Sequence, residues 1–342
     1  MRRLNFGKRN HVNMKPKTFL FSVTPFNQLA YQYNNRALSF QIDEIKLYHY
    51  APVTKKRRSR APLLIVFAWI NRPEILDLYP EQSFIRGLLN QGIDVYLLDW
   101  GDTPACQKQT IPDLIAALDH CSVWIKRDAK TSNLNLLGIC QGGIISLCYT
   151  ALTKFINQLI LLSTPIHCHT RSDILAKLLR KLDLKILPKE VPGFLMTQFF
   201  MSLRPFELIR QKQFQLSDNL RDQARCKKFL LLEKWLHDVP VLSGDLLKMF
   251  IQYFYQHNAL RKNRLVIGNQ VLSLNQLNIP ILNIMASKDR LIPNHASQHL
   301  KQIMNPNFYQ ERLYPTGHIG LYLKQDIVKK LTHDIAEWLS EP

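Results

Sequence analysis

The chain has 342 residues, of which 45 are Lys or Arg and 26 are Asp or Glu, so its formal net charge is +19. Hydrophobic residues make up 46% and charged residues 21%, which excludes a disordered chain and allows one large or two small domains. The longest apolar run, Leu63–Ile70, is far shorter than the about 20 residues of a membrane-spanning helix, so we expect no transmembrane segment.

In chain order, residues 1–40 are predicted to form a basic N-terminal arm, with no apolar stretch that would indicate a secretory signal. Apolar runs and helical periodicity then alternate. The predicted elements are a strand at 40–50, a strand at 63–69, a helix at 81–91, a strand at 93–100, a helix at 111–127, a strand at 133–138, a helix at 142–152 and a strand at 159–163. Strands with continuous apolar runs that alternate with helices predict an α/β fold with a mostly parallel sheet, covered on both faces.

The alternation stops at Pro165 and resumes near residue 279. The intervening segment is predicted to be mainly helical. The later elements are a strand at 281–286, a helix at 294–304, a strand at 309–314 and a helix at 326–339. We therefore expect an α/β core of residues 41–164 and 279–342, interrupted by a helical cap of residues 165–278.

The positive charge is unevenly distributed along these segments. Residues 1–60 hold 13 basic and 2 acidic residues, and residues 165–280 hold 18 and 9. Residues 61–164 and 281–342 are close to neutral. A basic chain can bind nucleic acid, an anionic surface or an acidic substrate. Since the charge avoids the predicted sheet and no nucleic-acid-binding motif is present, we expect no nucleic acid as partner; the basic run Lys55–Arg58 can equally be a solvated loop.

A G-x-C-x-G motif, Gly138 to Gly142, stands between a predicted strand and a predicted helix. This is the context of a nucleophile elbow, a sharp turn that places its apex residue, here Cys140, above the sheet. Unpaired N–H groups and the helix dipole at that position favour a thiolate. The alternative interpretation is a small buried cysteine that has glycines nearby by chance. The other five cysteines lack such a context, and six in all do not make a disulfide framework.

An elbow predicts that an acid and then a histidine follow in the chain, each after a strand. Asp289 follows the first strand after the insertion, and His318 lies in a glycine-flanked loop after the last strand. Each residue alone could be an ordinary loop side chain. We predict that Cys140 is the nucleophile, His318 the base and Asp289 the orienting acid. The oxyanion hole would be formed by the backbone N–H of Gln141 and by a second N–H from Trp69, Ile70 or Asn71, of which we favour Ile70.

The cysteine nucleophile bears on the type of reaction. A thiol that attacks a thioester forms another thioester, so the acyl group remains activated for transfer to a second acceptor. We therefore expect an acyltransferase, with a thioesterase or esterase of the same triad as the alternative. A non-enzymatic nucleic-acid-binding protein is a second alternative. No Cys/His spacing is typical of a metal site, and His167-Cys168-His169 is one isolated cluster, so we expect neither metal nor cofactor.

Seven segments of the chain resemble poly(3-hydroxyalkanoate) synthases. They are Trp69–Leu78, Arg86–Gly101, Leu136–Gly143, Phe199–Phe206, Glu233–Trp235, Phe250–Tyr255 and Gly317–Gly320. The resemblance covers about residues 40–340. The amino-acid sequences of the segments are similar to those of class III synthases, whose catalytic subunit works with a non-catalytic E subunit. One departure is Arg290, because members of the family usually have His directly after the acid.

The resemblance implies an α/β-hydrolase fold and polymerisation of (R)-3-hydroxyacyl-CoA, with 3-hydroxybutyryl-CoA as the expected monomer. The polyester would be held on Cys140, and CoA would be the leaving group rather than a cofactor. It further implies an E-type partner subunit, a homodimer formed through the cap, and a cytoplasmic location at the surface of polyester granules. The basic cap would then attract CoA phosphates, and the arm would bind the partner or the granule.

Overall fold

The computed structural model describes residues 30–31, 33–54, 59, 61–80, 83–102, 109–170, 173–202 and 223–341. Most of the predicted arm, the basic run Lys55–Arg58 and the second half of the Phe199–Phe206 segment lie outside the described residues.

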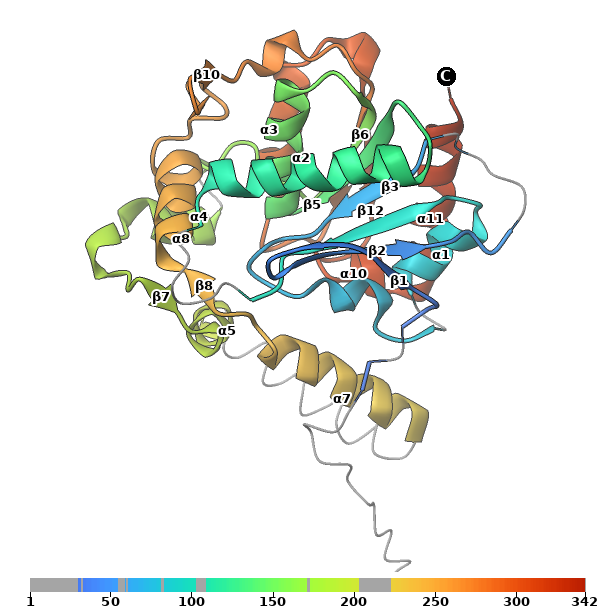
Figure 1. The fold of residues 1–342 in the computed structure, drawn as a ribbon. Coiled ribbons are helices and arrows are strands. Elements are labelled where there is room, and N and C mark those ends of the chain that lie inside the picture. The colour runs from blue at the N-terminus through green and yellow to red at the C-terminus, as the bar shows by residue number, and fades with distance from the viewer. Residues whose placement is uncertain are drawn as a thin grey trace, which may run out of the picture.

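Within these residues the centre of the molecule is an eight-stranded sheet with the order β1-β2-β4-β3-β5-β6-β11-β12 (Figure 1). The strands are β1 (Ala37–Ile42), β2 (Ile45–Tyr50), β3 (Leu63–Val66), β4 (Val95–Asp99), β5 (Leu134–Ile139), β6 (Ile156–Leu162), β11 (Ile281–Ala286) and β12 (Tyr309–Tyr314). From β4 to β12 all neighbours pair in parallel, whereas β2 is antiparallel to β1 and β4. The predicted α/β fold with a mostly parallel sheet is therefore confirmed.

The first part of the sheet differs from the prediction. The single strand expected at 40–50 is a hairpin, and its first strand begins at Ala37, inside the segment predicted as arm. The chain reverses at Asp43, whose φ of 50° is tolerated because aspartate is one of the residues that populate left-handed turns. Apolar residues alternate on both sides of this two-residue turn, which concealed the turn in the sequence pattern.

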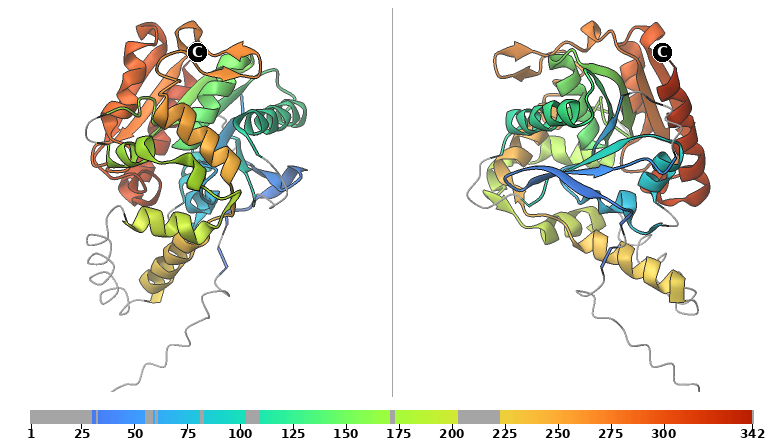
Figure 2. Two further views of the ribbon diagram at one scale, coloured as in Figure 1. Left: turned by 90° about the vertical axis from the view of Figure 1, so that its left-hand side faces the viewer. Right: turned by 45° about the vertical axis from the view of Figure 1, so that its right-hand side comes forward.

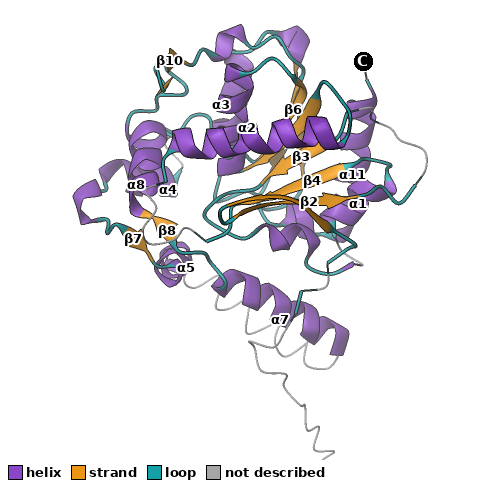
Figure 3. Cartoon of the chain, in the orientation of Figure 1, coloured by secondary structure: helices purple, strands orange, loops and turns teal. Residues whose placement is uncertain are grey.

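Two helical layers cover the sheet (Figures 1 and 3). The helices are α1 (Phe84–Asn90), α2 (Ile111–Asp128), α3 (Gln141–Leu152), α9 (Asn294–Gln298), α10 (Gly320–Leu323) and α11 (Gln325–Ser340), with 3₁₀ helices at Pro73–Asp77, His299–Gln302 and Pro306–Phe308. Alternate residues of β3 enter opposite cores: Leu64 and Val66 pack with α2 and α3, whereas Leu63 and Ile65 pack with α1 and α11. This two-sided burial explains the continuous apolar run at β3.

The segment between β6 and β11 leaves the sheet and returns to it, because these two strands are parallel neighbours. Its elements are α4 (Ile174–Lys181), a 3₁₀ helix (Leu184–Ile186), β7 (Glu190–Val191), α5 (Gly193–Ser202), α7 (Gln223–His237), β8 (Leu242–Ser243), α8 (Gly244–Phe250), a π-helix (Ile251–Gln256), β9 (Val266–Ile267), β10 (Gln270–Val271) and a 3₁₀ helix (Leu274–Gln276). Figure 2 shows α5 and α7 outside the sheet, at one end of the molecule. Among the described helices, we find no segment with the length and hydropathy of a membrane span.

Candidate active site

Cys140 stands at the sharp turn between β5 and α3. Its φ of 53° and ψ of −118° are rare for a residue with a side chain, and such a conformation costs on the order of 1–3 kcal/mol. The turn is held by two backbone hydrogen bonds: the N–H of Cys140 donates to the carbonyl of Leu162 at 2.9 Å, and its carbonyl accepts from the N–H of Gly143 at 3.1 Å. The sequence-predicted elbow is thus present in the backbone geometry.

The neighbouring glycines allow α3 to approach the sheet. A Cβ atom at Gly142 would overlap the carbonyl oxygens of Val66 and Phe67, and one at Gly143 would overlap the side chain of Thr164. Only hydrogen atoms fit in these places, so α3 can begin directly above β3 and lift Cys140 to the edge of the sheet.

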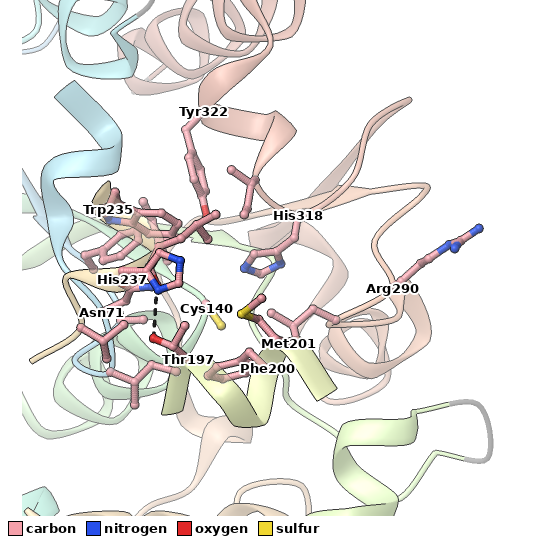
Figure 4. A pocket seen from close by; sticks show the side chains of 18 residues that line it. Asn71, Cys140, Thr197, Phe200, Met201, Trp235, His237, Arg290, His318 and Tyr322 are labelled. Carbon is pink, nitrogen blue, oxygen red and sulfur yellow. Dashed lines mark hydrogen bonds between the residues drawn. The ribbon is translucent and has the colours of Figure 1, made fainter. Parts of the chain in front are cut away.

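Asp289 and His318 come together from separate loops. Asp289 follows β11 and His318 follows β12, which are adjacent parallel strands, so their carboxyl ends meet. The Nδ1 atom of His318 lies 2.7 Å from Oδ2 of Asp289. Figure 4 shows the imidazole next to Cys140. The structure therefore brings the three predicted residues together.

The acid is fixed by its own loop. The backbone N–H groups of Leu291 and Ile292 each donate to Oδ1 of Asp289 at 2.9 Å, which leaves Oδ2 for the imidazole. The two loops are also joined, since the N–H of Lys288 donates to the carbonyl of Thr316 at 2.9 Å. The imidazole consequently meets a carboxylate whose orientation is set before any substrate arrives.

Burial and charge act in opposite directions on this pair. Burial alone would lower the pKa of His318, but the charge of Asp289 and its hydrogen bond to the imidazole outweigh this effect, so the pKa is raised well above its usual value. Burial would raise the pKa of Asp289, yet the nearby imidazolium lowers it below the usual value. An imidazolium–carboxylate pair results, and it lies next to the Cys140 side chain (Figure 4).

Cys140 and His318 open into a mostly apolar cavity of about 320 Å³ (Figure 4). The core contributes Phe67, Ala68, Ile70, Asn71, Ile139, Arg290, Leu291, Ile319 and Tyr322. The segment between β6 and β11 contributes Thr197, Phe200, Met201, Trp235, Leu236, His237 and Val239. An apolar cavity of this size, with a thiol in its wall, has room for an acyl group with a short aliphatic chain.

Of the two residues predicted for the oxyanion hole, Gln141 is next to Cys140 in the chain, and Ile70 lines the same cavity as Cys140. Gln141 follows Cys140 directly and is the first residue of α3. Ile70 lies in the turn after β3, where the N–H of Asn71 donates to the carbonyl of Ala68 at 3.4 Å, and it lines the cavity. This placement is compatible with the predicted role of both residues.

Several cavity residues were not predicted individually. His237 and Thr197 come from the inserted segment, and Tyr322 from the short helix α10. No local motif marks them, because their role depends on where α5, α7 and α10 pack. Arg290 borders the cavity, but Figure 4 shows its side chain extending away from Cys140.

The His167-Cys168-His169 cluster has structural contacts. The side-chain amide of Asn258 lies 2.8 Å from Nδ1 of His167, and Nε2 of His169 lies 2.8 Å from the carbonyl oxygen of Tyr255. Across the part of the chain that the structure describes, no group of three or more His, Cys, Asp or Glu residues is arranged to hold a metal ion.

Comparison with known proteins identifies the family. A sequence profile for the α/β-hydrolase fold matches residues 62–325, and a profile for the N-terminus of poly-beta-hydroxybutyrate polymerase matches residues 33–88. The poly(3-hydroxyalkanoate) polymerase subunit PhaC of Allochromatium vinosum is 37% identical over 306 residues, which cover 87% of this chain and 86% of that protein. The chain belongs to the poly(3-hydroxyalkanoate) polymerase family. The corresponding subunit of Synechocystis sp. is 33% identical over 315 residues, 88% of this chain and 83% of that one.

Solved structures show the same fold at low identity. A putative lipase from Acinetobacter baumannii superposes with a TM-score of 0.54 at 14% identity, covering 92% of this chain and 93% of the lipase. A monoacylglycerol lipase from Paleococcus ferrophilus gives 0.51 at 16% identity, covering 87% and 99%. The family and the α/β-hydrolase fold that the sequence resemblance implied are both confirmed.

Proposed function

We propose that the chain polymerises (R)-3-hydroxyacyl-CoA into a polyester, releases CoA, and holds the growing polymer as a thioester on Cys140. The observation that supports this most strongly is the site itself. In a member of the polymerase family, Cys140 opens into the same apolar cavity as His318, whose Nδ1 atom lies 2.7 Å from Asp289.

The first step is acylation. The Cys140 thiolate attacks the thioester carbonyl carbon, a new C–S bond forms, and the C–S bond to CoA breaks. The raised pKa of His318 means that the imidazolium is available to protonate the departing CoA sulfur. The N–H groups of Gln141 and Ile70 stabilise the oxyanion, and Asp289 stabilises the imidazolium.

The second step is elongation. The 3-hydroxyl of an incoming hydroxyacyl-CoA attacks the Cys140 thioester, while the now neutral His318 accepts the hydroxyl proton. An ester C–O bond forms, the C–S bond to Cys140 breaks, and the thiolate–imidazolium pair returns. The lengthened chain–CoA thioester then acylates Cys140 again, so each monomer added releases one CoA.

Residues 165–278 act in this proposal as a cap that closes the acyl cavity. Support comes from α5 and α7, which supply six of the 18 residues that line the cavity. Because the cavity is small and apolar, the expected monomer is short, with 3-hydroxybutyryl-CoA as the preferred substrate. The 18 basic residues of segment 165–280, against 9 acidic ones, would attract the phosphates of CoA.

The proposal includes macromolecular partners. Relatives that are more than 30% identical are named as subunits, which supports a class III arrangement with an E-type partner. Exposed apolar side chains on the cap, Ile174, Leu178, Ile186 and Phe194, support a homodimer formed through this region. The insoluble product implies work at the surface of cytoplasmic polyester granules, where the basic arm would assist binding.

Purified protein incubated with 3-hydroxybutyryl-CoA, with and without the E-type subunit, tests the proposal. We expect CoA release together with turbid polymer. Release of CoA with free 3-hydroxybutyrate and no polymer would instead establish a thioesterase, the alternative that the same triad allows.

A further inference from the structure

The loop after β3 is joined to the end of α7 by one arginine. The side chain of Arg72 is 20% exposed, and its Nε atom lies 2.9 Å from Oδ1 of Asp238 and 3.1 Å from the Asp238 carbonyl oxygen. Its Nη2 atom lies 2.8 Å from Oδ1 of Asp102. Asp238 directly follows α7, so a single guanidinium binds both the side chain and the main chain at the helix end. A lysine could not reproduce this forked contact.

Further hydrogen bonds fix the same short segment. The indole Nε1 of Trp235 donates to the carbonyl of Arg72 at 2.7 Å, and Trp235 is only 4% exposed. From the other side, the Thr197 hydroxyl of α5 donates to the carbonyl of Leu236 at 3.2 Å. The end of α7 is therefore held between the core loop and α5.

This junction lies behind the cavity wall. Ile70 and Asn71 line the cavity immediately before Arg72 in the chain, and His237 and Val239 line it on either side of Asp238. Figure 4 shows Asn71, Trp235, His237 and Thr197 together on one side of Cys140. The Arg72–Asp238 contact therefore joins the two chain segments that form this part of the cavity wall.

We propose that Arg72 and Asp238 form a clamp that positions the end of α7 against the loop after β3 and so determines the length of acyl group that the cavity accepts. The inference rests on the proposed function, because it concerns the acyl group delivered to Cys140. Neither residue lines the cavity, so both act as positioning residues.

The test compares Asp238→Asn with Asp102→Asn. Both replacements remove a carboxylate from the same guanidinium, but only Asp238 belongs to the cap, and Asp102 is 58% exposed. We expect Asp238→Asn to lower the ratio of kcat/KM for 3-hydroxybutyryl-CoA to that for 3-hydroxyhexanoyl-CoA by about tenfold, the order that one or two methylene groups contribute to discrimination. Asp102→Asn should leave the ratio within about twofold.

Arg72→Met, which keeps an unbranched apolar stem and removes the guanidinium fork, should shift the ratio in the same direction as Asp238→Asn. An unchanged ratio in folded Asp238→Asn protein would overturn the clamp. An equal shift in both asparagine variants would also overturn the clamp. The effect would then come from the loss of either carboxylate beside Arg72, and not from the contact between Arg72 and the cap.

A second readout needs no polymerisation. The rates at which a small and a bulky iodoacetamide alkylate Cys140, located by peptide mass spectrometry, report the width of the cavity directly. In Asp238→Asn we expect the bulky reagent to gain about tenfold relative to the small one, while Asp102→Asn keeps the original ratio. Absence of polymer in the wild type would contradict the proposed function, whereas an unchanged alkylation ratio would contradict the clamp alone.

Discussion

The α/β core and the inserted segment contribute to the cavity in different ways. The core supplies the three residues of the proposed catalytic triad, Cys140, Asp289 and His318, each at or shortly after the end of a sheet strand. The inserted segment supplies part of the apolar wall, including Phe200 and Trp235. These residues come from α5 and α7, which do not belong to the helical layers that cover the sheet. The residues of the proposed triad are therefore positioned locally at strand ends, whereas the shape of the proposed acyl pocket depends on how a helical segment packs over them.

The core and the inserted segment also differ in net charge. Residues 61–164 hold 7 basic and 9 acidic residues, and residues 165–280 hold 18 and 9. In the proposed function, the near-neutral core holds the residues of the thioester chemistry, and the basic segment attracts the anionic CoA part of the substrate. The comparison predicts that changes in the core alter kcat most and that changes in the inserted segment alter selectivity or KM.

The largest effect is expected at the nucleophile. Cys140→Ala should lower CoA release and polymer formation by about 10⁴-fold or more, because no other group in the proposed mechanism forms the acyl-enzyme. CoA release measured with a thiol reagent and polymer measured by turbidity report both activities. Cys148→Ala is the matched control, since Cys148 is fully buried in α3 and takes no part in the site. Polymer formed by Cys140→Ala protein would disprove the assignment of the nucleophile.

Asp289→Asn should reduce kcat by about 10²–10⁴-fold, because the imidazole loses the charge that orients and stabilises it. The pKa of His318 should fall, since the Asp289 charge is what raises it against burial. Titration of His318 by NMR should therefore show deprotonation at lower pH in the variant than in the wild type. A His318 titration that is unchanged in the variant would show that the carboxylate does not hold the imidazolium.

The same pair predicts the pH dependence of stability. Because folding raises the pKa of His318, this residue stabilises the fold at pH values below its pKa in the unfolded state. That stabilisation is lost as the pH rises through its pKa in the folded state. Because folding lowers the pKa of Asp289, this residue stabilises the fold at pH values above its pKa in the unfolded state. That stabilisation is lost as the pH falls through its pKa in the folded state. The difference in free energy of unfolding between wild type and Asp289→Asn should thus be large near neutral pH and shrink in acid, as measured by urea denaturation. A difference that grows in acid would contradict this coupling.

At the elbow, Gly142→Ala should destabilise the fold by roughly 1–3 kcal/mol, because the added Cβ overlaps the carbonyl oxygens of Val66 and Phe67. Gly317→Ala is the control, since a Cβ there meets only the Lys288 carbonyl oxygen at 3.6 Å, an ordinary contact. Denaturant midpoints would compare the two. Equal stability of both variants would show that α3 does not need its close approach to β3.

The smallest effect is expected for salt. Raising the ionic strength from about 0.05 to 0.5 M should increase KM for the acyl-CoA by roughly threefold with little change in kcat, because screening weakens attraction between the inserted segment and the CoA phosphates. Steady-state kinetics at several salt concentrations provide the measurement. An unchanged KM would remove the proposed role of this positive charge.

The sequence predicted the core better than the inserted segment for physical reasons. Buried parallel strands leave continuous apolar runs, and the Cys140 elbow needs glycines at fixed positions, so both are visible in the chain. The hairpin at Asp43 was missed because alternation continues across its turn. Trp235 lies in a segment that resembles the family, and His237 lies only in the predicted insertion. The positions of both residues in the cavity wall depend on how distant segments pack, which the sequence pattern does not show.

The most direct test of the account is mass spectrometry of the protein quenched in acid during turnover of 3-hydroxybutyryl-CoA. We expect 3-hydroxybutyryl units, one or more, on the peptide that contains Cys140, and no such adduct after treatment with hydroxylamine, which cleaves thioesters. Adducts confined to another residue, or turnover to polymer with Cys140 unmodified, would contradict covalent polymerisation on this cysteine.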